Sequence, residues 1–167
     1  MVKYVFVTTT NILFIVGALS LMGFRVNTTE SYPEGVYRLV SSEWERNDLV
    51  EVCLPEKIKD VAIERGYLKD HGRCGGHPPI IKKVAGISGD YIEISDAVSI
   101  NGEKYENSNL KIQDTDGHTL EPAKNEVVGV GHVWLLSTVT DKSFDSRYFG
   151  SIDERYVIGK LEALWTY

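Results

Sequence analysis

A serine beside a turn-forming proline lies in the first of three segments whose residues could carry out chemistry. In SYPEGVY, Ser31 precedes Pro33 and Gly35, and a short apolar run follows. A serine hydroxyl attacks a carbonyl carbon when a nearby base removes its proton. Serine, proline and glycine are also the usual composition of a plain turn. Ser31 is therefore a candidate nucleophile only if the chain supplies a base.

Two adjacent lysines could supply that base. Lys82 and Lys83 lie in IIKKVAGISGD, whose apolar residues indicate a strand. Because neighbouring side chains of a strand point to opposite faces, we expect one lysine to point inwards and the other to solvent. Burial lowers the pKa of a lysine, and the neutral amine can then act as a general base. The alternative is an edge strand whose lysines only discourage strand pairing.

The third segment, KSFDSRYFGSID, holds a hydroxyl group and two opposite charges. Ser143, Asp145 and Arg147 are spaced two residues apart. In an extended chain they would share one face and could bond to one another there. The alternative is a polar turn with a surface ion pair, which would contribute little to stability.

Short strands are expected to position these segments. From residue 36 onwards the chain consists of short runs rich in valine, isoleucine and tyrosine, broken by turn residues, which indicates a mostly-β domain. Asn101 and Gly102 stand between two alternating runs and predict a hairpin, because a type I′ turn needs positive φ at both positions. Residues 55–72 predict one helix, with Gly66 as its stop signal.

The amino-terminal segment predicts a membrane anchor. No charged residue lies between Tyr4 and Phe24, and a helix of roughly 20 apolar residues crosses a bilayer. A cleaved signal peptide and a buried core helix are the alternatives, but no small-x-small cleavage site follows the run. We expect residues 1–26 to form an uncleaved anchor helix. The positive-inside rule then puts residues 27–167, one domain, outside the cytoplasm.

The net charge of the chain bears on whether it binds nucleic acid. The net charge is −6 and the chain has no basic run, so nucleic acid is not an expected partner.

Cys53 and Cys74 form an even pair in a domain expected in an oxidising compartment. A disulfide or two free thiols are favoured over a zinc site made with His71 and His77. No metal and no other cofactor is expected.

Together, the three segments resemble the motifs of the type I signal peptidases, which are membrane-bound serine/lysine peptidases. The shared features are a serine just after a membrane anchor, Lys-x-x-x-Gly-x-x-Gly-Asp at the end of a strand, and Ser-x-Asp-Ser-Arg-x-x-Gly. SYPEGVY, RGYL and the closing LEALWTY resemble the TraF-type conjugative transfer peptidases more closely. LLSTVTDK replaces the Gly-Asp-Asn segment of general signal peptidases, which also favours this branch, and Ser88 replaces a usual proline.

The resemblance implies a signal-peptidase-like antiparallel β domain with a small helical insertion, and a role for each site residue. Ser31 matches the nucleophile and Lys82 the general base. Ser143 matches the residue that orients the lysine, and Asp145 with Arg147 matches its supporting ion pair. The backbone N–H of Ser31 is the expected first oxyanion donor, and the hydroxyl of Thr29 could be a second.

The implied function is that of a single-pass serine endopeptidase of the bacterial inner membrane, with its catalytic domain in the periplasm. Its partners would be the lipid bilayer and a membrane-tethered protein substrate, namely a pilin precursor or a similar exported protein, which it could also join into a circle. A general leader peptidase is the alternative with the same chemistry. A non-catalytic anchored module of a pilus or secretion machine is the alternative of another class. A self-cleaving repressor would need a DNA-binding helix-turn-helix where this chain has its apolar segment.

Overall fold

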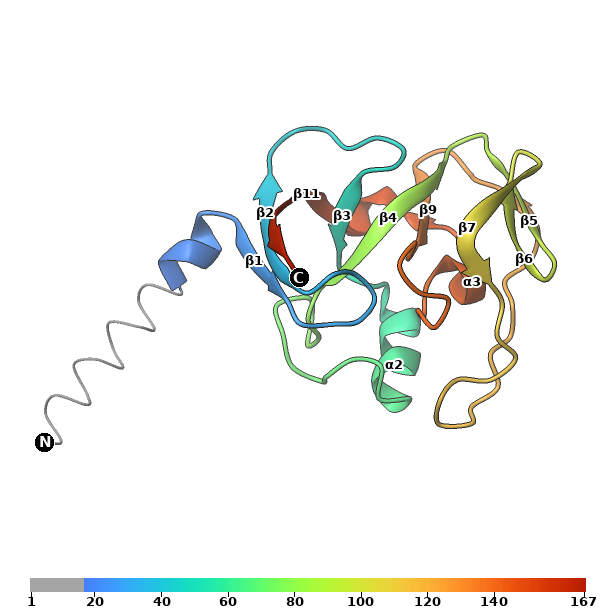
Figure 1. Cartoon of the computed structure of the whole chain (residues 1–167), viewed down its shortest axis with the longest axis horizontal. Helices are drawn as coiled ribbons and strands as arrows, with labels where there is room; N and C mark the ends of the chain where they lie inside the picture. Colours follow the sequence, from blue (N-terminus) through green and yellow to red (C-terminus); the bar gives the residue numbers. More distant parts are fainter. Residues whose placement is uncertain (1–16) are drawn as a thin grey trace, which may run out of the picture.

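The computed structural model describes residues 17–167, in which an amino-terminal helical stretch leads into a β domain (Figure 1). Most of the expected anchor, residues 1–16, lies outside the described residues. Residues 17–21 are helical, and Phe24–Asn27 form strand β1, so the last anchor residues belong to the β domain instead. Among residues 17–167, no helix has the length and apolar character needed to cross a membrane.

A seven-stranded antiparallel sheet forms the larger layer. The strand order places the carboxyl-terminal strand between two strands that come early in the sequence. The strands in spatial order are β1 (Phe24–Asn27), β2 (Gly35–Val40), β11 (Val157–Thr166), β3 (Leu49–Val52), β4 (Ile80–Ile87), β9 (His132–Leu136) and β10 (Ile152–Asp153).

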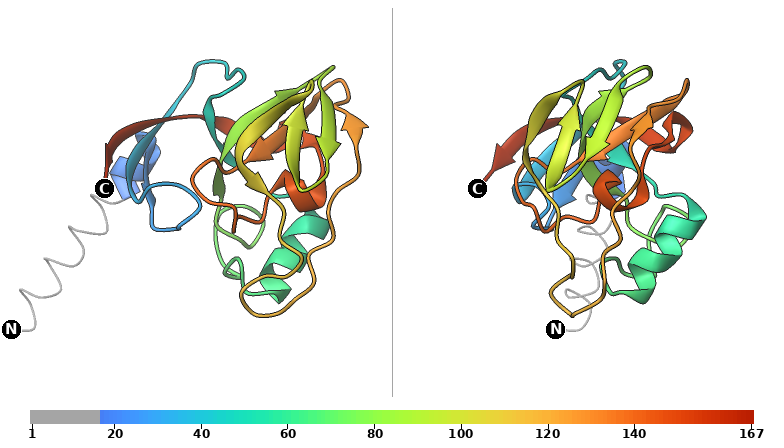
Figure 2. Two further views of the ribbon diagram at one scale, coloured as in Figure 1. Left: turned by 45° about the vertical axis from the view of Figure 1, so that its right-hand side comes forward. Right: turned by 90° about the vertical axis from the view of Figure 1, so that its right-hand side faces the viewer.

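A four-stranded antiparallel sheet lies at the β4 and β9 end of the larger one (Figures 1 and 2). The predicted hairpin at Asn101-Gly102 is confirmed, because both residues have positive φ, 55° and 84°. The runs rich in valine, isoleucine and tyrosine that were expected to be extended all contain strands. The small sheet consists, in spatial order, of β7 (Glu103–Asn109), β6 (Ala97–Ile100), β5 (Tyr91–Ile94) and β8 (Glu126–Val127).

The helices are short. The helix predicted for residues 55–72 is only α2 (Glu56–Glu64), so that prediction was too long. The stop at Gly66 is confirmed, since its φ of 73° is left-handed and ends the helix. Beyond it the chain forms a loop that a disulfide from Cys53 to Cys74 ties back to the end of β3. The helices that follow α2 in the chain are α3 (Ser146–Phe149) and the 3₁₀ turn η1 (Glu154–Tyr156).

Strand β9 connects the two layers of the core. Val133 and Leu135 pack with the valines of β3 and β4, whereas Trp134 and Leu136 pack with the small sheet. A strand buried on both faces is apolar at consecutive positions, as this one is. The residue that follows, Ser137, is consequently delivered into the interior, where it is fully buried.

Candidate active site

The turn between β1 and β2 carries Ser31. Asn27, the last residue of β1, is buried and its side chain bonds to the backbone of the turn. On the other side, the Ser137 hydroxyl donates to the Ser31 carbonyl oxygen at 2.6 Å. Gly35 begins β2 so close to the carboxyl-terminal strand that a Cβ there would lie 2.1 Å from the Trp165 carbonyl oxygen. The Pro33 and Gly35 positions therefore belong to a tightly held turn.

Lys82 points inwards from β4, opposite Val50 of β3. Its side chain is 3% exposed, whereas Lys83 is half-buried. The prediction that the two lysines take different faces is thus confirmed, and Lys82 is the inward one. Its Nζ donates a hydrogen bond of 2.6 Å to Ser143 Oγ.

Burial has a direct electrostatic consequence for Lys82. Removal from water lowers its pKa from 10.5 to about 8. The Asp145 carboxylate acts in the opposite direction, but the Arg147 guanidinium offsets it. Because these two charges are paired with each other, they leave the desolvation of the amine as the dominant effect.

Asp145 and Arg147 form an ion pair with 0% exposure of either side chain. The guanidinium donates to the carboxylate from Nε at 2.8 Å and from Nη2 at 2.7 Å. Burial opposes the charge on Arg147, but the bonds to Asp145 outweigh it and raise the pKa of Arg147. The alternative of a surface ion pair is therefore wrong.

Residues 143–147 are not extended, so the shared face that an extended chain would give does not form. Asp145 is the N-cap of α3 and accepts the Arg147 backbone N–H, so the chain turns into a helix at this point. The capping turn brings the guanidinium back onto the same carboxylate. Asp145 also accepts the backbone N–H of Ser137, which ties the segment to the end of β9.

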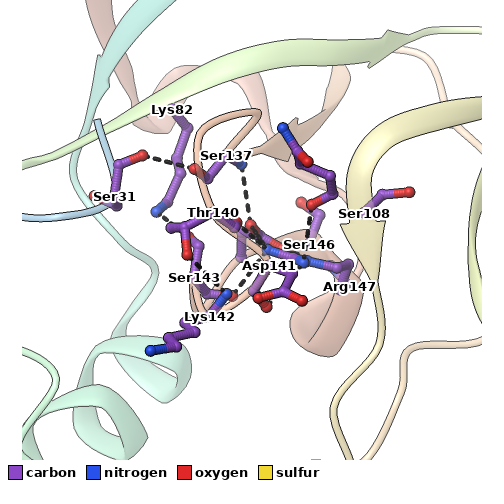
Figure 3. A network of polar contacts seen from close by, with 12 residues as sticks. Ser31, Lys82, Ser108, Ser137, Thr140, Asp141, Lys142, Ser143, Ser146 and Arg147 are labelled. Carbon is purple, nitrogen blue, oxygen red and sulfur yellow. Dashed lines mark hydrogen bonds and ion pairs between the residues drawn. The ribbon is translucent and has the colours of Figure 1, made fainter. Parts of the chain in front are cut away.

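A cavity of about 950 Å³ brings the candidate residues together. Ser31, Lys82 and Ser143 all line it, as do Ala62 of α2 and residues of the loop that follows β7. Figure 3 shows the Lys82 side chain directed at Ser143, with Ser31 to its left and Ser137 to its right in this view. The Ser31 hydroxyl is 3.2 Å from Thr29 Oγ1. Among residues 17–167, Lys82 Nζ has its hydrogen bond with Ser143 and none with Ser31.

The glycine-aspartate end of the second segment has a supporting role in the fold. Asp90 pairs with Arg46 at 2.6 Å and accepts hydrogen bonds from Ile87 N–H and from Asn101. Burial acts against ionisation, but these bonds outweigh it and lower the pKa of Asp90. Asp90 thereby fixes the turn that ends β4, beyond the lysines.

The two cysteines are joined to each other, with their Cα atoms 5.2 Å apart. Both sulfur atoms are used in this bond, so the four-residue zinc set considered from the sequence has no thiolates. His71 lies at the surface and His77 is buried. The disulfide instead anchors the loop after α2, which forms one wall of the cavity.

Sequence reasoning missed two residues of the site, Asn27 and Ser137. Asn27 ends a strand directly before a Thr-Thr pair, and an asparagine in that position often bonds to the backbone two residues onwards. This local signal was available. Ser137 gave none beyond its position in LLSTVTDK, because its partner Ser31 lies 106 residues earlier.

Comparison with known proteins identifies the class to which this fold and site belong. The sequence model of the family described as signal peptidase, peptidase S26, matches residues 1–166. The chain therefore belongs to the S26 signal peptidase family. Membership of this family indicates peptidase activity.

The TraF relatives are similar over most of the chain. A plasmid transfer protein TraF from Escherichia coli is 33% identical, covering 99% of this chain and 96% of the relative. A conjugal transfer protein TraF from Agrobacterium fabrum is 35% identical, covering 87% and 84%. A signal peptidase IB from Staphylococcus aureus is 36% identical but covers only 48% of this chain and 50% of the relative. A signal peptidase I crystal structure from Enterococcus faecalis matches with a TM-score of 0.45 and 20% identity, covering 72% of this chain and 98% of that one.

Proposed function

We propose that the chain is a membrane-anchored serine endopeptidase that processes a pilin precursor, or a similar exported protein, in conjugative transfer. Ser31 is the proposed nucleophile and Lys82 the proposed general base. The observation that carries this proposal is the buried Lys82 amine, with its pKa lowered to about 8, in the same cavity as Ser31. A lysine held in this way is neutral often enough to accept a proton near neutral pH.

The proposed reaction has two stages. Lys82 Nζ accepts the Ser31 hydroxyl proton while Ser31 Oγ bonds to the substrate carbonyl carbon. The peptide C–N bond then breaks, Lys82 returns the proton to the leaving amine, and an acyl group remains on Ser31. In the second stage a water molecule, or another amine, attacks the acyl carbon while Lys82 Nζ accepts its proton. The ester C–O bond to Ser31 then breaks, and the proton passes from Lys82 to Ser31 Oγ, which restores the hydroxyl.

Ser143 is proposed to orient the base. A neutral lysine has two N–H groups and one lone pair. The hydrogen bond that Lys82 donates to Ser143 Oγ uses one N–H and leaves the lone pair free for Ser31. Asp145 and Arg147 hold the segment that carries Ser143, since the Arg147 guanidinium also donates to the Ser143 carbonyl oxygen at 3.2 Å.

The Ser31 backbone N–H is the proposed oxyanion donor. Among residues 17–167 it has no hydrogen-bond acceptor, so it is available to a substrate. The Thr29 hydroxyl, the second donor suggested by the sequence, gives its proton to Asn27 Oδ1 at 2.7 Å. A hydroxyl has a single proton. Thr29 can stabilise an oxyanion only after turning away from Asn27.

The proposed location is the bacterial inner membrane, with residues 1–26 as a single-pass anchor and the β domain in the periplasm. The similarity to TraF proteins over nearly the whole chain supports a role in conjugation. A substrate tethered in the same bilayer would meet the Ser31 turn at a high effective concentration. The Cys53–Cys74 disulfide suits an oxidising compartment.

Cyclisation of the product is part of the proposal because the acyl-enzyme can be captured by an amine. If the amine belongs to the other end of the same chain, the new peptide bond closes a circle and no water is consumed. A general leader peptidase would use the same residues and release a linear product. A non-catalytic anchored module would use none of them.

The two lysines of β4 provide a matched test. Lys82→Ala should abolish turnover of a pilin precursor, because the base is lost, whereas Lys83→Ala should retain most of it. Turnover is measured as the rate of appearance of the shortened product. Full activity of the Lys82→Ala protein would exclude Lys82 as the base, and full activity of Ser31→Ala would favour the non-catalytic module.

A further inference from the structure

The side chain of Asn27 makes five hydrogen bonds to a single short turn. Its Nδ2 shares two protons among three carbonyl oxygens, those of Thr29 at 3.1 Å, Tyr32 at 2.8 Å and Pro33 at 3.1 Å. Its Oδ1 accepts the Thr29 backbone N–H at 3.2 Å and the Thr29 hydroxyl at 2.7 Å. These partners lie on both sides of Ser31 in the sequence. Asn27 thus fixes the path of the chain around the proposed nucleophile.

The partners determine which way the Asn27 amide faces. Three carbonyl oxygens can only accept, so the NH₂ group must face them, and the backbone N–H of Thr29 requires the amide oxygen. Asn27 is 5% exposed. An unpaired amide at this burial would be costly.

The same bonds determine the orientation of the Ser31 hydroxyl. Asn27 Oδ1 is an acceptor only, so the Thr29 hydroxyl donates its one proton to it. In the 3.2 Å contact between Thr29 Oγ1 and Ser31 Oγ, Ser31 must then be the donor. The three groups form a chain in which Ser31 donates to Thr29 and Thr29 donates to Asn27. Without substrate, the Ser31 proton is directed at Thr29 and not at Lys82.

We propose that Asn27 is a positioning residue for the peptidase reaction: it holds the Ser31 turn and, through Thr29, sets the resting orientation of the Ser31 hydroxyl. This inference rests on the proposed function of Ser31. Among residues 17–167, the Asn27 side chain forms no hydrogen bond with Lys82, Asp145 or Arg147. Its loss should therefore change the rate of the chemical step and leave the titration of Lys82 unchanged.

Two substitutions separate the bonds of Asn27 from its size. Asn27→Ala removes all five bonds. Asn27→Asp keeps the shape and the acceptor but places a carboxylate against three carbonyl oxygens. The full-length proteins are purified in detergent, and kcat and KM are measured with a pilin precursor. Each rate is divided by the folded fraction of the protein, which thermal unfolding measures.

We expect both variants to lower kcat at least tenfold while KM changes less than threefold. The pH midpoint of kcat should stay unchanged in the uncharged Asn27→Ala protein. Asn125→Ala is the matched control, since Asn125 accepts one backbone N–H from Ile94 in the small sheet, and it should keep the wild-type kcat.

Wild-type kcat in both Asn27 variants would overturn the proposal. So would a loss of activity that disappears once rates are corrected for the folded fraction, because Asn27 would then serve the fold alone. Ser31→Ala is assayed in parallel. Turnover retained by that protein would refute the proposed nucleophile itself, whatever the Asn27 variants do.

Discussion

The pH dependence of turnover follows from the burial of Lys82. With a pKa of about 8, the amine is neutral in about half the molecules at pH 8, about a tenth at pH 7 and about a hundredth at pH 6. With the ordinary value of 10.5, the neutral fraction at pH 7 would be only about 0.03%. Burial therefore increases the amount of working base at pH 7 about 300-fold.

The assay is the rate of precursor cleavage at saturating substrate between pH 6 and pH 10. We expect kcat to rise about tenfold per pH unit below pH 8 and to level off above it. A rate that is flat over this range, or one that still rises about tenfold per pH unit up to pH 10, would refute a buried lysine as the base. Lys83→Ala should leave the midpoint in place, because that side chain lies on the other face of β4.

The same lowered pKa carries a cost in stability. Between about pH 8 and pH 10.5 the unfolded chain binds more protons at Lys82 than the folded chain does, so folding stability rises with pH over this window. The difference in pKa corresponds to about 3 kcal/mol. Lys82→Met, which removes the buried amine, should be more stable than the wild type below pH 8 by up to that amount. Denaturant unfolding at pH 7 checks this, and a less stable Lys82→Met protein would contradict the reasoning.

Three further predictions concern the surroundings of the site. Asp145→Asn should lower the free energy of unfolding by about 3–5 kcal/mol, because it leaves a buried guanidinium without its counter-charge; urea unfolding measures the loss, and a change below 1 kcal/mol would contradict the burial of the pair. Thr29→Val should lower kcat less than the roughly hundredfold typical of losing an oxyanion donor, and a greater loss would mean that Thr29 turns to the oxyanion. Replacing Cys53 and Cys74 by serine should destabilise the fold by about 3 kcal/mol, since the bond closes a loop of 21 residues; an unchanged thermal midpoint would show that the loop is held without the bond.

The strands and the opposite faces of Lys82 and Lys83 could be predicted because both depend on local alternation, whereas the choice of Lys82 as the base came from the resemblance to the signal peptidase motif. Valine- and isoleucine-rich runs mark the strands, and a period of two separates Lys82 from Lys83 without any knowledge of partners. The Asn101-Gly102 hairpin follows equally from the two residues of its turn. Each of these features depends only on residues that lie close together in the sequence.

The turn into α3 could not be predicted from spacing. A four-residue helix is too short to show a helical period, and alternate polar residues at 143, 145 and 147 look the same as an extended strand. Only the capping role of Asp145 separates the two conformations, and it depends on a bond formed in three dimensions. The burial of Asp145 and Arg147 likewise results from the packing of distant segments around them.

The link between Ser137 and Ser31 was out of reach for the same reason. The two residues are 106 positions apart, and their contact exists because β9 delivers Ser137 to the interior beside the turn between β1 and β2. Asn27 lies four residues before Ser31, so its turn could be expected. The sequence could not show that this turn bonds to every polar atom of the Asn27 amide.

The most direct test of the peptidase is the mass of a pilin precursor that is co-expressed with the wild-type protein or with Ser31→Ala. We expect the precursor to lose a terminal peptide only with the wild type, and to be lighter by one further water if its ends are joined. A precursor left intact by the wild type, or shortened equally by Ser31→Ala, would contradict a Ser31 peptidase that acts on pilin.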